Sequence, residues 1–167
     1  MSKKIIFTNG LIDLAQPRLG SKVIFKTDDF FASANRIISP TEPVFKAGVF
    51  DKHGKWMDGW ESRRKRTEGH DYIILKLGKS GKIKKVDVDT SHFNGNQPSM
   101  VSIEGANSSS DKISQLKWQF LLSKKKIKAN SHHYFKVNSK KVNIIWVINP
   151  NKCPLLLTQS RLSQWVP

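Results

Sequence analysis

The order of hydrophobic and polar positions predicts short strands along most of the chain. Residues 83–90 alternate, so Val86 and Val88 share one face and Asp87 and Asp89 share the other. Similar apolar or alternating runs predict further strands at residues 21–25, 72–77, 100–104, 116–122, 133–137 and 142–148. Turn residues recur about every ten positions, and no long amphipathic helix is evident. We therefore expect an all-β, antiparallel two-sheet sandwich forming one domain over residues 1–167.

The segments between the strands carry turn and cap signals. Gly78 and Ser80-Gly81 predict the end of the strand at 72–77, and Asn94-Gly95 predicts a hairpin-like step in a polar loop. Residues 32–38 form the one short helical stretch, and either Asp28 or Asp29 before it would cap its backbone N–H groups or belong to a functional site. Residues 1–20 are interpreted as a lead-in segment and 107–112 as a Ser-rich loop.

One stretch is denser in chemistry than any other part of the sequence. Residues 55–71 hold two indoles, several carboxylates, a run of four basic side chains and a histidine, with glycines at the bends. A solvated charge run does not need tryptophans, and a core strand does not carry this many charges. The stretch therefore predicts a functional site.

The charge of the chain is unusual but carries little functional information. The net charge is +16, from 29 Lys and Arg against 13 Asp and Glu, and such an excess is compatible with a nucleic acid or with an anionic small molecule. Most of the excess is scattered lysine, and no zinc finger, helix-turn-helix or aromatic RNA-binding signature accompanies it. Nucleic acid is therefore the weaker interpretation.

The apolar content does not favour a membrane protein. No apolar run reaches the roughly eighteen residues of a membrane span, and Thr8 and Asn9 interrupt the N-terminal apolar run. The single Cys153 excludes an internal disulfide. We expect a cytoplasmic protein.

Several blocks of the sequence closely resemble the allantoicase family. The blocks are Val23-Ile24-Phe25, Thr27-Asp28-Asp29-Phe30-Phe31-Ala32, the motif from Gly54 to Arg66 with Gly69-His70-Asp71, Lys76-Leu77-Gly78, and Val86-Asp87-Val88-Asp89-Thr90 with Phe93, Gly95-Asn96 and Pro98. The resemblance implies a jelly-roll sandwich of the galactose-binding-like kind. It also implies a hydrolase of purine degradation that cleaves allantoate with water into ureidoglycolate and urea. Family members usually carry two homologous repeats, and this chain resembles the first.

The C-terminal residues depart from the family pattern. Residues 146–153 are followed by 154–161, which do not match the usual closing strands of a repeat. Our hypothesis is that residues 150–167 form an atypical tail, truncated or frame-shifted relative to the family. A jelly roll without its last strand would leave a neighbouring strand as an open edge.

The chemistry of allantoate suggests roles for the residues of the dense stretch and its neighbours. The substrate carboxylate needs a fixed cation, for which Arg64 is the first choice, because the resemblance implies an arginine there in both repeats, and Arg63 the second. Glu61 and His70 are the candidate acid–base pair, although Glu61 would equally suit an ion pair and His70 a structural role. Trp60, like Trp56, either rigidifies the loop or contacts substrate. The candidate acceptors for the ureido N–H groups are Asp58, Glu61, Asp87, Asp89, Asn94 and Asn96.

The sequence leaves cofactor and partners open. Oxygen and nitrogen donors for a metal are present, but they show no tight ligand spacing, so a metal remains undecided. These donors are Asp28, Asp29, His70, Asp87, Asp89 and His92. A homo-oligomer is compatible with the sequence. The alternatives to an enzyme are a catalytically inactive single-repeat ligand-binding module and a basic nucleic-acid-associated protein.

Overall fold

Strands dominate the computed structural model of the chain, which describes residues 10–110, 112–150, 156–157 and 159–165. The strands are β1 (Leu11–Asp13), β2 (Lys22–Lys26), β3 (Phe50–Asp51), β4 (Gly54–Lys55), β5 (Trp60–Glu61), β6 (Asp71–Lys82), β7 (Lys85–Asp89), β8 (Met100–Ala106), β9 (Gln119–Lys126), β10 (His132–Lys136), β11 (Lys141–Asn149), β12 (Leu156–Leu157) and β13 (Gln159–Trp165). Within the described ranges, the helical elements are the 3-10 turns η1 (Pro17–Leu19), η2 (Ala34–Ile38) and η3 (Ile113–Gln115). None of these turns has the length or apolar character to cross a bilayer.

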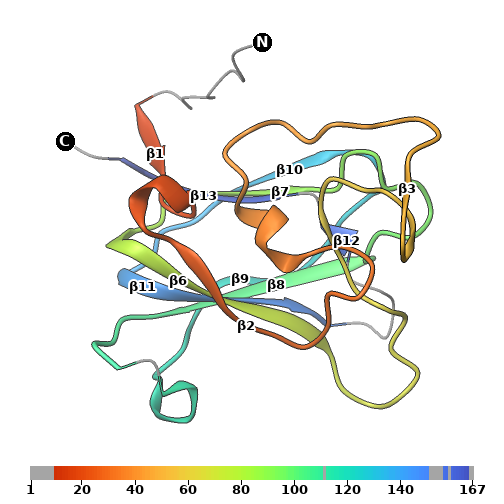
Figure 1. Cartoon of the computed structure of the whole chain (residues 1–167). Coiled ribbons are helices and arrows are strands. Elements are labelled where there is room, and N and C mark those ends of the chain that lie inside the picture. The colour runs from red at the N-terminus through yellow and green to blue at the C-terminus, as the bar shows by residue number, and fades with distance from the viewer. Residues whose placement is uncertain (1–9, 111, 151–155, 158, 166–167) are drawn as a thin grey trace.

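Two antiparallel sheets form the body of the molecule (Figure 1). One sheet has the strand order β1-β13-β7-β10, and the other has the order β2-β6-β11-β8-β9. Neighbours in each sheet are often far apart in sequence, as in β6 paired with β11 and β7 paired with β13. The fold is an antiparallel jelly-roll sandwich, which confirms the sandwich expected from the alternating pattern and the jelly roll that the resemblance implies.

The main core lies between the two sheets. Val86 and Val88 of β7 are fully buried and join a hydrophobic cluster with inward side chains of β6, β8 and β11. The alternation in residues 83–90 therefore predicted the inner face of β7 correctly. The opposite face of β7 is also buried, because the side chains of Asp87 and Asp89 are only 5% and 1% exposed.

Gly78 does not end a strand as the sequence predicted. Strand β6 continues to Lys82, and the backbone of Leu19 and Gly20 crosses directly over Gly78. A Cβ atom at position 78 would lie 1.9 Å from the Leu19 carbonyl oxygen. The prediction of a turn at Gly78 and Ser80-Gly81 was wrong, because this glycine permits the close approach of another segment.

The two ends of the described chain belong to the sandwich. Strand β13 pairs with β7 on one side and with β1 on the other. The lead-in interpretation was therefore wrong for residues 11–20, where Leu14 and Ala15 join the core. The condition for an open edge next to a missing last strand is not met at β7, because β13 pairs with it. Residues 1–9, 111, 151–155 with Cys153, 158 and 166–167 lie outside the described residues.

The 3-10 turn η2 is capped by neighbouring side chains. Ser33 accepts a hydrogen bond from the backbone N–H of Asn35, and the Asp29 carboxylate accepts one from that of Ala34 at 3.3 Å. Of the two acids considered for capping, Asp29 has this role and Asp28 does not.

The strand predicted from residue 116 begins at Gln119, and the preceding Trp118 packs against Trp146 on the outer side of the five-stranded sheet.

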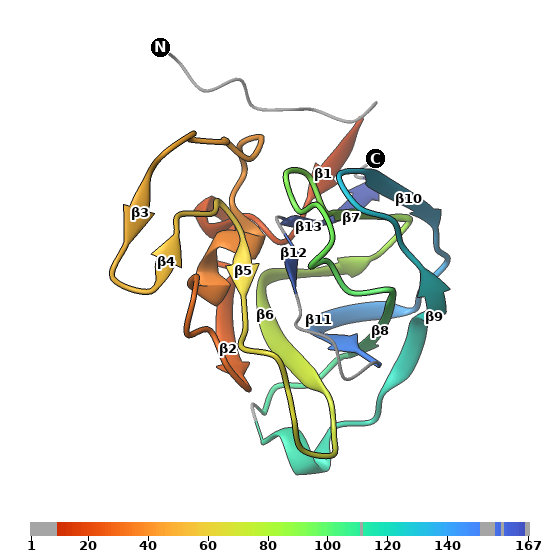
Figure 2. The ribbon, with the colours of Figure 1, turned by 90° about the vertical axis from the view of Figure 1, so that its right-hand side faces the viewer.

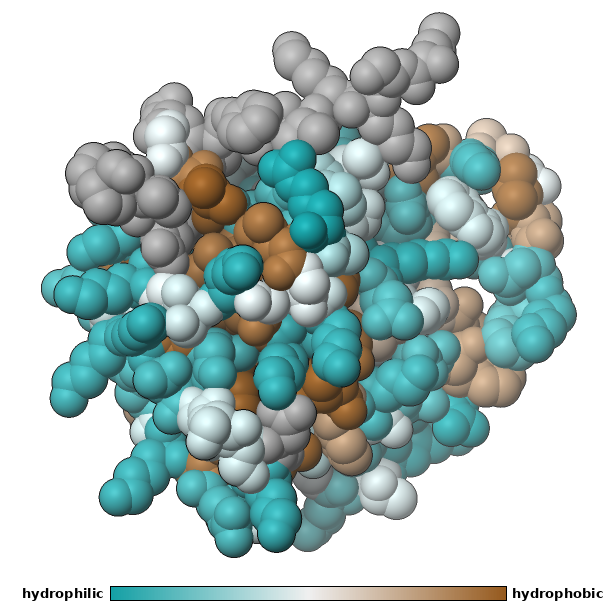
Figure 3. Space-filling view, turned by 60° about the vertical axis from the view of Figure 1, so that its left-hand side comes forward, coloured by the Kyte–Doolittle hydropathy of each residue, from teal (hydrophilic) through white to brown (hydrophobic). Residues whose placement is uncertain are grey.

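The surface carries many hydrophilic residues. Figure 3 shows a side of the molecule that is mainly hydrophilic, with hydrophobic residues in patches between the polar ones. On another side, shown in Figure 2, the β3–β4 hairpin stands beside β5 and away from the two sheets. The dense stretch identified in the sequence begins at Lys55 in this hairpin and runs through β5 to Asp71 at the start of β6.

Candidate active site

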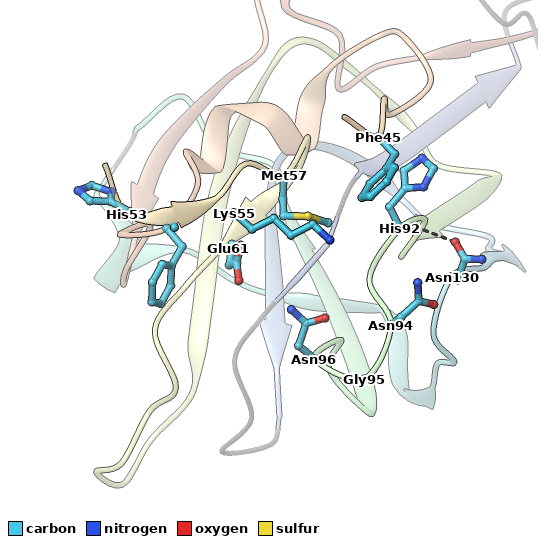
Figure 4. A pocket seen from close by; sticks show the side chains of 12 residues that line it. Phe45, His53, Lys55, Met57, Glu61, His92, Asn94, Gly95, Asn96 and Asn130 are labelled. Carbon is cyan, nitrogen blue, oxygen red and sulfur yellow. Dashed lines mark hydrogen bonds between the residues drawn. The ribbon is translucent and has the colours of Figure 1, made fainter. Parts of the chain in front are cut away.

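A cleft of about 760 Å³ lies where the β3–β4 hairpin, β5 and the 91–98 loop meet. It is lined by Phe31, Phe45, His53, Gly54, Lys55, Met57, Glu61, His92, Asn94, Gly95, Asn96 and Asn130. We call it the Glu61 cleft. Figure 4 shows Lys55 and Glu61 pointing into a space that Asn94 and Asn96 face from the other side.

The backbone on both sides of Glu61 holds its side chain in this position. Glu61 and Ala32 exchange both N–H···O bonds at 3.1 Å, and β12 pairs with the opposite edge of β5. The preceding Trp60 is fully buried, and its Nε1 donates a 2.7 Å hydrogen bond to the Asp28 carbonyl oxygen. Because side chains alternate along a strand, burial of Trp60 directs Glu61 toward the cleft.

The environment of Glu61 favours its protonated form. Burial, with a smaller contribution from the negative charge of Asp51, raises the pKa of Glu61 from 4.5 to about 6. A carboxyl group in this range can donate or accept a proton near neutral pH. This is the property required of a general acid or base.

Lys55 supplies a cation to the same cleft. Its Nζ lies 4.8 Å from the centre of the Phe45 ring, which also lines the cleft. Lys55 is not among the candidate residues of the sequence, although it belongs to the dense stretch. The signal in the sequence is its place in the dense stretch, six residues before the glutamate.

The opposite wall of the cleft is a loop in a constrained conformation. His92 has φ of 68°, and its N–H donates to Oδ1 of Asn130 at 2.8 Å. Its Nε2 lies 3.3 Å from the Pro43 carbonyl oxygen, and its ring contacts Phe45. These contacts hold Asn94 and Asn96 across from Glu61, so three of the predicted residues share one cleft.

The two arginines chosen from the sequence lie at a second cleft of about 640 Å³, which adjoins the first at Phe31. The Arg63 N–H and guanidinium donate to the Asp28 carboxylate at 2.6 and 2.9 Å. Burial raises the pKa of Asp28, but the hydrogen bonds and charge of Arg63 outweigh that effect, so the net pKa is lowered. Arg63 therefore braces the loop against Asp28, while Arg64 lines this second cleft without lining the first.

Several other predicted residues have contacts elsewhere. The Asp58 carboxylate accepts a 3.0 Å hydrogen bond from the Val44 N–H, and Trp60 is too deeply buried to touch a ligand in this conformation. His70 lines a separate hollow with Glu104 and Phe120. Asp87 and Asp89 lie beside His132. The structure thus does not bring His70 to the Glu61 cleft, and none of these residues lines it.

Comparison with known proteins assigns the family. Residues 12–149 match the model of the allantoicase repeat. Over 131 residues, the chain is 51% identical to a Pseudomonas fluorescens SBW25 protein named "Probable allantoicase", covering 77% of this chain and 39% of that protein. A Pseudomonas syringae pv. tomato protein of the same name is 50% identical over 128 residues, covering 76% of this chain and 39% of that protein. The chain therefore spans about two fifths of the length of these relatives.

Solved structures agree with this result. The crystal structure of allantoicase from Saccharomyces cerevisiae superposes with a TM-score of 0.79 at 27% identity, covering 98% of this chain and 51% of that one. A family 32 carbohydrate-binding module from C. perfringens, solved with galactose, matches at a TM-score of 0.61 and 12% identity over 92% of this chain and 100% of its own, which shows a shared fold alone. The resemblance seen in the sequence blocks is confirmed, and the chain belongs to the allantoicase family.

Proposed function

We propose that the chain carries a site for the hydrolysis of allantoate to ureidoglycolate and urea. The family assignment supports the substrate, and one local observation carries the proposal: Glu61, with a pKa of about 6, shares a cleft with a lysine and three amide side chains. Allantoate is a small molecule with one carboxylate and two ureido arms. It matches this set of groups, because it needs one cation and several hydrogen-bonding amides.

The reaction requires a proton transfer that Glu61 suits. The bond between the central carbon of allantoate and one ureido nitrogen breaks, and the oxygen of water forms a new bond to that carbon. One proton of the water is released, and the leaving nitrogen gains one to become urea. In our proposal, protonated Glu61 gives its proton to the leaving nitrogen, and the resulting carboxylate takes a proton from the attacking water.

The remaining residues of the cleft would bind and orient the substrate. The Lys55 ammonium pairs with the substrate carboxylate, which holds the central carbon near Glu61. The amides of Asn94, Asn96 and Asn130 can each donate to a ureido carbonyl and accept from a ureido N–H. This assignment replaces Arg64 by Lys55 as the carboxylate partner, because Lys55 lines the cleft that contains Glu61.

The sequence-based roles of the other residues stay predictions. Arg64 would take the substrate carboxylate only if the reaction used the adjoining second cleft. His70 would act with Glu61 only after a rearrangement that joins two separate hollows. A cytoplasmic location, a homo-oligomeric state and the boundaries of the repeat domain also stay predictions.

The test is urea release from allantoate by the purified chain and its variants. We expect Glu61→Gln to lower kcat by about 100-fold or more, because it removes the proton donor while keeping the shape. We expect Lys55→Met to act mainly on KM. Glu68→Gln and Lys52→Met are matched controls, since both residues are exposed and neither lines the cleft.

Binding separates an enzyme from an inactive ligand-binding module. If allantoate stabilises the chain against heat without releasing urea, and Lys55→Met abolishes the stabilisation, the cleft binds ligand without catalysis. If Arg64→Ala abolishes binding and Lys55→Met does not, the substrate occupies the second cleft. If allantoate neither stabilises the chain against heat nor yields urea, the proposal is refuted.

A further inference from the structure

A histidine and three carboxylates come together away from the Glu61 cleft. His132, the first residue of β10, pairs across the sheet with Asp89, the last residue of β7. Asp87, two residues earlier, lies on the same face of β7, and Glu42 reaches the group from the loop between η2 and β3. Side chains from three separate segments therefore converge at one point.

Asp87 fixes how the imidazole of His132 is oriented. The Nδ1 atom lies 3.0 and 3.2 Å from the two Asp87 carboxylate oxygens. An ionised carboxylate only accepts hydrogen bonds, so an ionised Asp87 selects the tautomer with its proton on Nδ1. The ring also stacks on Tyr134, with centroids 5.6 Å apart and planes 7° from parallel. Both contacts direct Nε2 to the other two carboxylates.

The distances around Nε2 are those of ligands that share an ion. Nε2 lies 3.7 Å from Oε2 of Glu42 and 3.7 Å from Oδ2 of Asp89. This separation exceeds an ordinary N–H···O hydrogen bond of about 2.7–3.2 Å. Two ligands bound at about 2.0–2.2 Å from one metal lie roughly 3–4 Å apart, depending on the angle between them. The three ligand atoms all lie within 4.8 Å of one another.

We propose that Glu42, Asp89 and His132 bind a divalent first-row transition cation, Zn²⁺ or Mn²⁺, with Asp87 orienting the histidine. One imidazole nitrogen and two carboxylate oxygens suit these cations, whereas Ca²⁺ and Mg²⁺ prefer sets made only of oxygen. A carboxylate that holds the second ring nitrogen is the usual partner of a metal-bound histidine. Asp87 and Asp89 were among the metal donors considered from the sequence, whereas Glu42 was not.

The cation would tie together two walls of the Glu61 cleft. Glu42 precedes Pro43, whose carbonyl oxygen contacts His92, and Phe45 of the same loop lines the cleft. Asp89 directly precedes the loop that carries Asn94 and Asn96. A metal held between Glu42 and Asp89 therefore restrains both loops without contacting the substrate. Its binding does not depend on the reaction that we propose for the cleft.

The experiment measures metal binding without an activity assay. The purified chain is stripped with a chelator and titrated calorimetrically with Zn²⁺, Mn²⁺ and Ca²⁺, and its Tm is recorded with each ion. We expect one equivalent of Zn²⁺ or Mn²⁺ to bind and to raise Tm, with weaker binding of Ca²⁺.

Variants locate the site. We expect Glu42→Gln and His132→Gln to weaken binding by at least 10-fold, and Asp87→Asn by about 10- to 100-fold. Glu68→Gln and His70→Gln are the matched controls and should leave the affinity unchanged. Glu42 lies on an exposed loop, so Glu42→Gln tests the proposal even if the His132 variant does not fold.

Three results would overturn the proposal. They are the absence of stoichiometric binding, a clear preference for Ca²⁺, and an affinity that Glu42→Gln does not change.

Discussion

Replacing Glu61 with glutamine should stabilise the folded chain relative to the wild type more at a pH above 6 than at pH 4. The pKa of Glu61 is raised in the folded state, from 4.5 to about 6, because its carboxylate is partly buried near Asp51. Below pH 4.5 the group is protonated in both the folded and the unfolded chain, so its full favourable contribution to the free energy of unfolding is present. As the pH rises through about 6, the folded chain must bury a charge, and that contribution is lost.

The magnitude follows from the difference between the two pKa values. A change from 4.5 to about 6 corresponds to at most about 2 kcal/mol. Solvent reaches part of the side chain and screens its charge, so we expect about 1 kcal/mol. Glutamine has nearly the same shape and no charge, so the variant should lack this pH-dependent loss.

Urea denaturation of both proteins at pH 4 and pH 7.5 measures the effect. The free energy of unfolding of the wild type, relative to Glu61→Gln, should fall by about 1 kcal/mol between the two pH values. Glu68→Gln controls for the removal of an exposed negative charge. A relative stability that is constant, or that rises with pH, would show that burial does not raise this pKa and would remove the basis for Glu61 as a proton carrier.

Three further substitutions test other parts of the structure. Lys55→Met should raise KM for allantoate at least 10-fold with a smaller effect on kcat, as steady-state urea release would show; an unchanged KM would place the carboxylate elsewhere. Trp60→Phe should lower the free energy of unfolding by about 1–3 kcal/mol, because the hydrogen bond to the Asp28 carbonyl is lost and a cavity remains; a loss below about 0.5 kcal/mol would show that buried Trp60 does not stabilise β5 in this way. Gly78→Ala should destabilise by several kcal/mol or prevent folding, because its Cβ would overlap the Leu19 carbonyl; a midpoint in urea equal to the wild type would contradict this packing.

The sandwich was predictable because its strongest signals are local. Alternation places Val86 and Val88 inward whatever β7 pairs with, so the inner face was correct before its partners were known. The role of Gly78 was not predictable, since the segment that crosses it comes from the beginning of the chain. The closing strand was missed for a similar reason: residues 159–165 depart from the family pattern, yet their backbone pairs with β7 and β1.

The site was predictable in part. Glu61, Asn94 and Asn96 come from two segments, and the structure brings them to one cleft. His70 follows Glu61 closely in sequence, but the intervening loop carries it to another hollow. The basic run suggested Arg63 as a substrate ligand, whereas Asp28, distant in sequence, holds its guanidinium. Density of chemistry in a sequence thus indicates a functional region without showing which side chains share a cavity.

The most direct test of the proposed site is urea release from allantoate by this chain and by Glu61→Gln, with Glu68→Gln as control. The account predicts release by the wild type and the control, and a loss of about 100-fold or more in kcat for Glu61→Gln. Release by Glu61→Gln at the rate of the wild type would contradict it.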